Sequence, residues 1–257
     1  MATPSWIEDR VSGVVAKVQL RNQLLAAMPV GELEPLLSDL ECVPLTPGQA
    51  LYESGGRITH AFFPATSIVS LLYTMADGAT AEVALVGREG VVGLALAMGG
   101  DRTSSRASVR TAGNAYRLAA EILKREFNKA GALHGLLLRY TQALLTQMAQ
   151  TAVCNRYHSV DQQLSRWLLQ SLDRLDSIEI CMTQELIANT LGVRREGVNE
   201  AAGRLQAEGM VQLRHGLITV LNRSRLEQMT CECYGVVRKE FDRLLPGAQP
   251  GASSLGP

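Results

Sequence analysis

The chain has 257 residues, of which 46% are hydrophobic and 19% are charged, and its formal net charge at pH 7 is zero. This composition describes a folding protein with a substantial core and excludes an intrinsically disordered chain. A neutral chain has no global attraction for nucleic acid, which argues against a nonspecific DNA-packaging protein but leaves room for a local basic surface. The length favours two domains.

The cysteines and the hydropathy indicate where the protein works. Five cysteines occur singly apart from one C-x-C pair, and the N-terminus lacks the features of a signal peptide. Thiols in this pattern are typical of a reducing compartment, so we expect a cytoplasmic protein. No apolar run reaches the roughly 20 residues that a membrane helix needs, so we expect no membrane partner.

The first half is expected to form short helices followed by a β-roll. Residues 21–40 carry leucines at helical spacing, interrupted by Pro29 and Gly31, which predicts two short helices. From Cys42 to about Leu118, short apolar runs alternate with glycine and proline turns, which predicts an antiparallel, jelly-roll-like β-roll. The expected strands are "ECVPL", "QALYE", "THAFFP", "SIVSLLY", "AEVALV", "VVGLAL", "RASVRT" and "AYRLA".

A long helix is expected after the roll, from Glu121 to about Asn155. Side chains that recur every seven residues along it are typical of a helix with a seam for a partner. We therefore predict a homodimer. The alternative is a helix that covers its own β-domain. The expected dimer contacts are Leu137, Tyr140, Leu144, Met148 and Thr151.

A second domain begins at Ser159. The run "SVDQ" is a capping box, in which the Ser159 hydroxyl and the Gln162 side chain satisfy exposed helix amides reciprocally. The fold class that we expect is α+β. The expected domains are a sensory roll with its N-terminal helices (21–120), a long dimerisation helix (121–158), a winged helix-turn-helix domain (159–245) and a flexible tail (246–257).

The stretch "MTQELIANTLGVRREGVNEAAGRLQAEGMVQL" has the spacing of a helix-turn-helix. Ala188 is small where two helices cross, Gly192 suits a tight turn, and Val198 begins the next apolar stripe. The following "MVQLRHGLITVL" predicts a β-hairpin, which would complete a winged helix. Six arginines against three glutamates make this span locally basic. The expected DNA-binding residues are Thr183, Arg194, Arg195, Glu196, Asn199, Glu200, Arg204, Arg214 and His215.

The chain resembles the Crp/Fnr family of bacterial transcription regulators in the order of these parts. The resemblance is most specific in "SVDQQLSRWLLQSL" and in "PGQALYESGG" through "DGATAEVALVGREGVVG". The resemblance implies a homodimer that binds double-stranded DNA, with half-sites about 34 Å apart, a sensory roll, and contact with RNA polymerase. It also implies that Arg195 and Glu196 contact base edges. Glu200 stands where the family usually has arginine, so we expect a different half-site.

Departures from the family's cyclic-nucleotide motif argue against cyclic AMP as the effector. Cyclic-nucleotide-binding members carry Gly-Glu for the ribose and Arg-Ser or Arg-Thr for the phosphate. Here Gly93 precedes a leucine, Ser105 stands at the position of the phosphate arginine, and Arg106 comes one position later. A buried ribose hydroxyl without its acceptor would lose water and gain no partner. We predict no established cofactor and leave open an unidentified nucleotide or other anionic effector. Its candidate ligand residues are Arg88, Gly93, Ser105 and Arg106.

No metal site is predicted. The four histidines lack metal-ligand spacing, and the cysteines lack the clustered N-terminal set of iron–sulfur members of the family. Cys231 and Cys233 are expected on one helix, where residues i and i+2 point apart, so the pair is interpreted as buried or idle. Haem ligation by a single histidine stays open.

An enzyme is not expected. A cupin needs paired histidines and a carboxylate within its strands, where only His60 occurs, and no Gly-x-Ser-x-Gly elbow accompanies "RTSSR". The remaining alternative is a signalling protein that does not bind DNA, in which the roll senses a nucleotide and the winged helix binds a protein partner. For a regulator, we expect a shift of the roll to pass through the long helix to a hinge near His158 and Ser159.

Overall fold

The computed structural model describes residues 20–214 and 216–245, and the predicted tail at 246–257 lies outside them. The N-terminal part begins with two short helices, α2 (Gln23–Ala26) and α3 (Val30–Leu37), as the spacing predicts. Asn22 caps α2 by accepting from two backbone amides of the helix. Its side-chain amide donates to the carbonyls of Pro64 and Gly90, both at 2.9 Å. This buried asparagine therefore ties the helices to the strands that follow.

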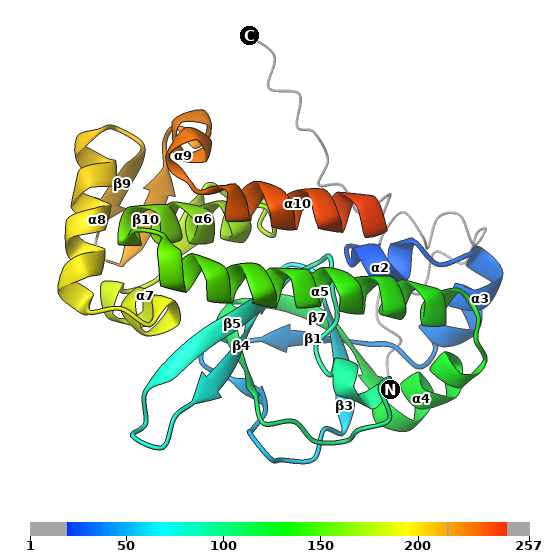
Figure 1. Ribbon diagram of the computed structural model, residues 1–257. Helices are drawn as coiled ribbons and strands as arrows, with labels where there is room; N and C mark the ends of the chain where they lie inside the picture. Colours follow the sequence, from blue (N-terminus) through cyan, green and yellow to red (C-terminus); the bar gives the residue numbers. More distant parts are fainter. Residues whose placement is uncertain (1–19, 215, 246–257) are drawn as a thin grey trace, which may run out of the picture.

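Residues 41–119 form the predicted antiparallel roll (Figure 1). One sheet has the order β1-β7-β3 and the other has the order β2-β6-β4-β5, with antiparallel neighbours throughout. The expected α+β fold class is confirmed. The strands are β1 (Glu41–Leu45), β2 (Ala50–Tyr52), β3 (His60–Pro64), β4 (Ile68–Thr74), β5 (Thr80–Val86), β6 (Arg106–Thr111) and β7 (Gly113–Ala119).

One expected strand, "VVGLAL", is not a strand. Val92 makes a single bridge to Phe62, and the chain then forms a short 3-10 helix, η1 (Leu94–Leu96). Gly93 has a φ of 95° and lies so close to β3 that a β-carbon there would be 3.1 Å from the His60 carbonyl oxygen. The glycine turns the chain away from the sheet at this point, because a left-handed residue cannot continue a strand. The side chains of Val91, Val92 and Leu96 are buried all the same.

The segment predicted as one long helix forms two helices, α4 (Ala120–Asn128) and α5 (Ala132–Tyr157). Ala130 has a φ of 56°, a left-handed conformation that interrupts a helix. The carboxylate of Glu32 then accepts from the Ala132 amide at 2.7 Å and caps α5 from outside. Neither α5 nor any other described helix is both long and apolar enough to cross a membrane.

The C-terminal part is a winged helix, as predicted. Ser159 and Gln162 form the expected capping box at the start of α6. The hairpin of the wing is joined by a third strand, so that the sheet has the order β8-β10-β9. The elements are α6 (Val160–Leu172), β8 (Glu179–Cys181), α7 (Gln184–Leu191), α8 (Arg195–Ala207), β9 (Val211–Arg214), β10 (Leu217–Val220), α9 (Arg223–Met229) and α10 (Glu232–Leu244).

The last helix, α10, returns along α5, so that α5 lies between the roll and α10 (Figure 1). Phe241, Leu244 and Leu245 belong to the core that fills the roll and the inner face of α5. Tyr234, near the start of the same helix, packs in the separate core of the winged helix. α10 therefore contributes to both cores and connects them.

Buried polar contacts also join the roll to the winged helix. The guanidinium of Arg110 on β6 lies 3.3 Å from the carboxylate of Glu82 on β5. It also donates to the Ser171 hydroxyl at 2.8 Å and lies 3.8 Å from the ring centre of Trp167. Ser171 and Trp167 belong to α6, so this one side chain bridges the two parts of the molecule.

Candidate nucleic-acid interface

A short turn joins α7 to α8. Thr183 is the N-cap of α7, and its hydroxyl accepts from the Leu186 amide at 3.2 Å. Gly192 ends α7 with a φ of 66°, a conformation that glycine adopts without steric cost. The Val193 amide donates to the Ala188 carbonyl at 3.1 Å and closes the turn. This is the geometry expected of a helix-turn-helix.

α8 has one buried face and one exposed face. Its inner side chains are at most 2% exposed and pack in the winged-helix core; they are Val198, Ala201, Ala202 and Leu205. The predicted recognition residues lie on the opposite face and are exposed; they are Arg195, Glu196, Asn199 and Glu200. Figure 1 shows α8 at an outer edge of the molecule, on the side away from α3 and α4. The recognition face is therefore accessible.

Three of the six arginines in this region are held by carboxylates. The pairs are Arg204–Asp161, Arg223–Asp173 and Arg225–Glu208. Arg204 donates to Asp161 of α6 from both Nε and Nη2, at 2.8 to 3.2 Å. A guanidinium bound in this bidentate way is already neutralised and has less to offer a phosphate. Arg204, a predicted DNA contact, is thus directed toward α6.

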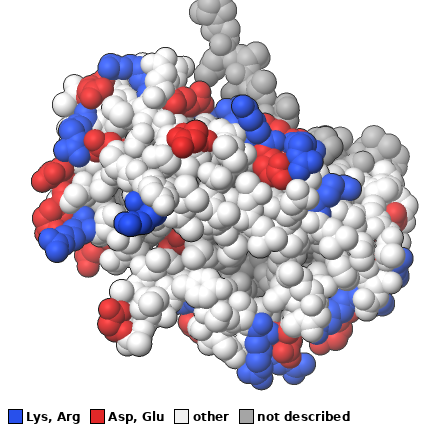
Figure 2. Space-filling view, in the orientation of Figure 1, with Lys and Arg blue, Asp and Glu red and all other residues white. Residues whose placement is uncertain are grey.

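The other three arginines remain available. Arg194 precedes α8, Arg195 begins it, and Arg214 ends β9 of the wing; all three are exposed. None of them forms an ion pair with another residue within 20–214 or 216–245. His215, the predicted contact at the tip of the wing, lies outside the described residues. Figure 2 shows basic and acidic side chains mixed along the edge that α8 occupies, so the surface is basic only locally.

The residues predicted to contact a dimer partner lie mostly in the core of the chain itself. Leu137, Tyr140 and Leu144 are buried in the core that the roll and α10 share with α5, and Met148 is half-buried against it. Thr151 is also buried and accepts from Arg166 of α6. The sequence alternative, a helix that covers its own β-domain, thus describes this face of α5. The exposed apolar side chains of α5 lie on another face, with Leu138 53% and Leu145 61% exposed.

The four candidate ligand residues of the roll do not contact one another through any described hydrogen bond or ion pair. Arg88 lies 2.5 Å from Asp176, and Arg106 lies 3.2 Å from Glu53. Ser105 is buried and bonds to Thr103, while Gly93 serves the turn before η1. A cleft between β5, α5, α6 and α7 has room for about one water molecule, which is far too small for a nucleotide.

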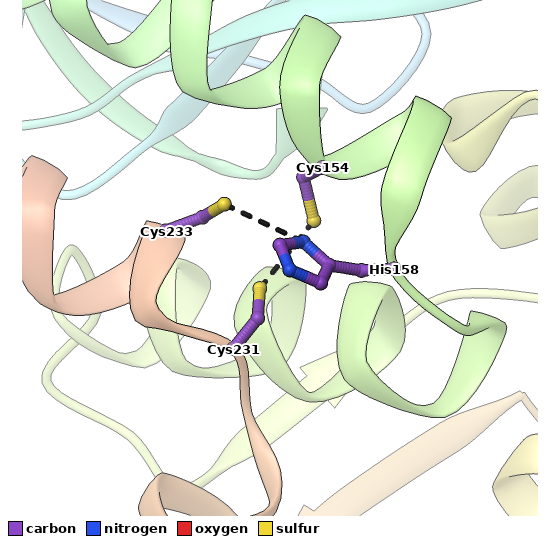
Figure 3. Close-up of side chains that lie close together, drawn as sticks. All are labelled: Cys154, His158, Cys231 and Cys233. Carbon is purple, nitrogen blue, oxygen red and sulfur yellow. Dashed lines mark hydrogen bonds between the residues drawn. The ribbon is translucent and has the colours of Figure 1, made fainter.

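Sequence reasoning missed one group of side chains. Cys154, His158, Cys231 and Cys233 each place a potential ligand atom within 4.8 Å of the others (Figure 3). The prediction that the two cysteines of the C-x-C pair point apart is wrong, because α10 begins at Glu232 and Cys231 is its extended N-cap. The only local signal was the i, i+4 spacing of Cys154 and His158, which places both on one helix face.

These thiols differ in acidity. A hydrogen bond from the Cys154 thiol lowers the pKa of Cys231 to about 5. Burial raises the pKa of Cys233 to about 11, and the shared hydrogen bond with Cys231 raises the pKa of Cys154 above its ordinary value. One thiolate can therefore exist in this cluster at neutral pH.

Comparisons with known proteins agree with this architecture. Residues 162–229 match the family model described as the Crp-like helix-turn-helix domain. No curated protein matches the chain in sequence. Among solved structures, FixK2 from Bradyrhizobium japonicum matches with a TM-score of 0.62 at 16% identity, over 75% of this chain and 98% of FixK2.

Two further structures give similar values. A protein from Eubacterium rectale, described as a transcriptional regulator of the Crp/Fnr family, has a TM-score of 0.63 at 18% identity, over 80% of this chain and 96% of its own. The c-di-GMP-responsive global regulator CLP of Xanthomonas campestris has a TM-score of 0.61 at 15% identity, over 76% of this chain and 100% of its own. At these identities the likeness concerns the fold.

Proposed function

We propose that this chain, which carries a Crp-like helix-turn-helix domain within the fold of Crp/Fnr regulators, is a transcriptional regulator that binds double-stranded DNA sequence-specifically. The observation that carries the proposal is α8, whose apolar face is buried while its polar face is exposed at an outer edge. A helix placed in this way can lay its N-terminal residues on base edges in a major groove. We propose no enzymatic activity, and we place the protein in the cytoplasm, where such a regulator meets DNA.

The chemistry of the exposed residues supports base recognition. Arg195 can donate two hydrogen bonds to guanine, and the carboxylates of Glu196 and Glu200 can accept from the amino group of cytosine. Arg194 and Arg214 have no carboxylate partner in the described parts of the chain, so they can neutralise phosphates. Thr183 and Asn199 are exposed as well and add polar groups that can form hydrogen bonds with DNA.

We further propose that two copies meet along α5. Leu138 and Leu145 are exposed and lie seven residues apart, and the exposed Ala152 follows after seven more. A heptad spacing of this kind keeps one face of a helix toward a partner helix. Figure 2 shows a largely uncharged surface across the middle of the face where Figure 1 places α5. The proposed contact is thus displaced by one residue from the heptads predicted from the sequence.

The signal is proposed to reach the DNA-binding domain through the contact between the roll and α6. Arg110 belongs to the roll yet donates to Ser171, which lies in the last turn of α6. A ligand that shifts β6 would therefore bias the orientation of the winged helix. An anionic effector at Arg88 or Arg106 would have to displace the carboxylate that each now binds. Thermal-shift screening with cyclic mono- and dinucleotides tests for such an effector.

Selection of fragments from genomic DNA by the purified full-length protein tests the proposed function. We expect enrichment of inverted repeats with half-sites about 34 Å apart, and an affinity that falls steeply as salt rises. Arg195→Ala should weaken binding by about 1–3 kcal/mol per base contact and relax the preference at that base. Arg225→Ala is the matched control, because Glu208 already holds that guanidinium.

Absence of an enriched sequence, together with binding that salt does not weaken, would contradict the proposal. It would favour a protein partner for the winged helix instead, with Glu196 and Glu200 as exposed contacts. Contact with RNA polymerase is a separate expectation, tested by transcription from a selected fragment.

A further inference from the structure

The four side chains Cys154, His158, Cys231 and Cys233, called the Cys/His cluster below, lie where three helices meet. Cys154 is in the last turn of α5, and His158 is the residue between α5 and the N-cap of α6. Cys231 and Cys233 come from the start of α10 (Figure 3). The three cysteines are 4% exposed or less and form an apolar cluster of their own.

The four ligand atoms lie within 4.8 Å of one another, which is close enough for a single ion to reach all of them. The Sγ atoms of Cys154 and Cys231 are 3.5 Å apart, and Cys233 Sγ lies 3.6 Å from His158 Nδ1. In a tetrahedral zinc site with Zn–S near 2.3 Å and Zn–N near 2.0 Å, two sulfurs lie about 3.8 Å apart and a sulfur and a nitrogen about 3.5 Å apart. Only small side-chain movements would therefore bring all four atoms to one ion.

The surroundings of His158 agree with a ligand role. Its Nδ1 faces the sulfurs, while its Nε2 lies 3.4 Å from the carboxylate of Glu232. A metal-bound histidine almost always donates its other ring N–H to a carboxylate or carbonyl, which fixes the tautomer. In addition, Gln163 of α6 donates to the His158 carbonyl at 2.9 Å and so holds the backbone of the ligand.

We propose that the Cys/His cluster binds one Zn²⁺ ion through three thiolates and Nδ1 of His158. Four protein ligands with buried sulfurs leave no open coordination position, which is the character of a structural zinc site. An iron–sulfur cluster fits less well, because its four protein ligands are spread over two or four iron atoms, so some of them must lie farther apart than the ligands of a single ion. Binding releases the thiol protons to solvent, and no electron is transferred.

The position of the site gives the ion a mechanical role. Cys154 and Cys231 are 77 positions apart in the chain, so the ion would close a long loop. It would hold the start of α10 against the junction of α5 and α6, and with it the winged helix against the long helix. Cross-links that close long loops restrict the unfolded chain and stabilise the fold. The metal site itself does not depend on whether the winged helix binds DNA.

Metal binding by the full-length protein tests the proposal directly. Reduced, chelator-treated protein is titrated with Zn²⁺ against a chromophoric chelator, and with Co²⁺ in a spectrophotometer. We expect one equivalent of zinc, a rise in the melting temperature, and a Co²⁺ spectrum with thiolate charge-transfer bands and the strong d–d bands of a tetrahedral site. Cys231→Ser and Cys233→Ser should lose these signals. Cys42→Ser is the matched control, because Cys42 is exposed and lies outside the Cys/His cluster.

If a buried cysteine variant fails to fold, a variant of the exposed Glu232 still tests the proposal. Its side chain is 73% exposed, so Glu232→Ala should fold normally and yet lower the zinc affinity about 10- to 100-fold by removing the acceptor of His158. The proposal is overturned by a folded, reduced protein that binds no zinc, or by binding that survives the loss of both Cys231 and Cys233. An iron–sulfur chromophore in the purified protein, or a Cys154–Cys231 disulfide that persists under reducing conditions, would overturn it as well.

Discussion

The buried ion pair between Glu82 and Arg110 provides a quantitative test of how the roll is joined to the winged helix. Their side chains are 7% and 3% exposed. Arg110→Met keeps much of the volume but leaves the Glu82 carboxylate buried without its cation, and it removes the contacts to Ser171 and Trp167. Removing one partner of a buried pair costs about 3–5 kcal/mol. That loss is a large fraction of the roughly 5–15 kcal/mol that stabilises a typical domain.

A double-mutant cycle measured by urea unfolding isolates the pair. Glu82→Gln should cost less than Arg110→Met, because Arg110 retains Ser171 and Trp167. The double variant should lose less unfolding free energy than the two single variants lose together, by about 2 kcal/mol or more, because no unpaired charge remains. Arg125→Met is the control, since its exposed pair with Asp39 is worth about 0–1 kcal/mol. The reasoning would be refuted if each single variant lost less than about 1 kcal/mol and the double variant lost only their sum. A buried charge left without its partner should cost several kcal/mol.

The same pair predicts a pH dependence. Burial raises the pKa of Glu82 above the ordinary carboxyl value of 4.5, and Arg110 opposes that shift. At pH values between the unfolded and the folded pKa of Glu82, the folded chain binds more protons than the unfolded chain. This contribution to stability is therefore fully present below the unfolded pKa and is lost as the pH rises through the folded pKa. Glu82→Gln should abolish this component of the stability profile, and Arg110→Met should enlarge it.

Three further outcomes follow from local geometry. Gly192→Ala should lower the free energy of unfolding by about 1 kcal/mol in chemical denaturation, because Gly192 adopts a left-handed conformation. Gly203→Ala, in a helix with open space around it, should raise that free energy by about as much, and equal effects of the two substitutions would contradict the reasoning. Ser159→Ala should cost about 1 kcal/mol by removing the capping box, and an unchanged unfolding midpoint would count against that role. Leu145→Glu should convert the proposed dimer to a monomer in light scattering without unfolding it, and a dimer that persists would exclude this face.

Features that depend on neighbouring residues could be predicted from the sequence. The strands between turns, the capping box at Ser159 and the bend at Gly192 all rest on interactions within a few positions. The helix-turn-helix and its exposed Arg195 followed from the same local rules. By contrast, the break before α5 was missed, because it depends on Ala130 in a left-handed conformation and on a carboxylate from α3.

The tertiary structure alone decided which element covers each apolar face. Helical periodicity shows that Leu137 and Leu144 share a buried face, but a second chain, the roll and α10 are all apolar and would satisfy that pattern equally. Likewise, no spacing rule connects Cys154 with Cys231, because their proximity arises only when α10 returns along α5. Local propensity therefore determined the helices, the strands and the helix-turn-helix. Contacts between distant segments determined which face of α5 is buried and which side chains form the Cys/His cluster, because a sequence pattern records neighbours along the chain and not neighbours in space.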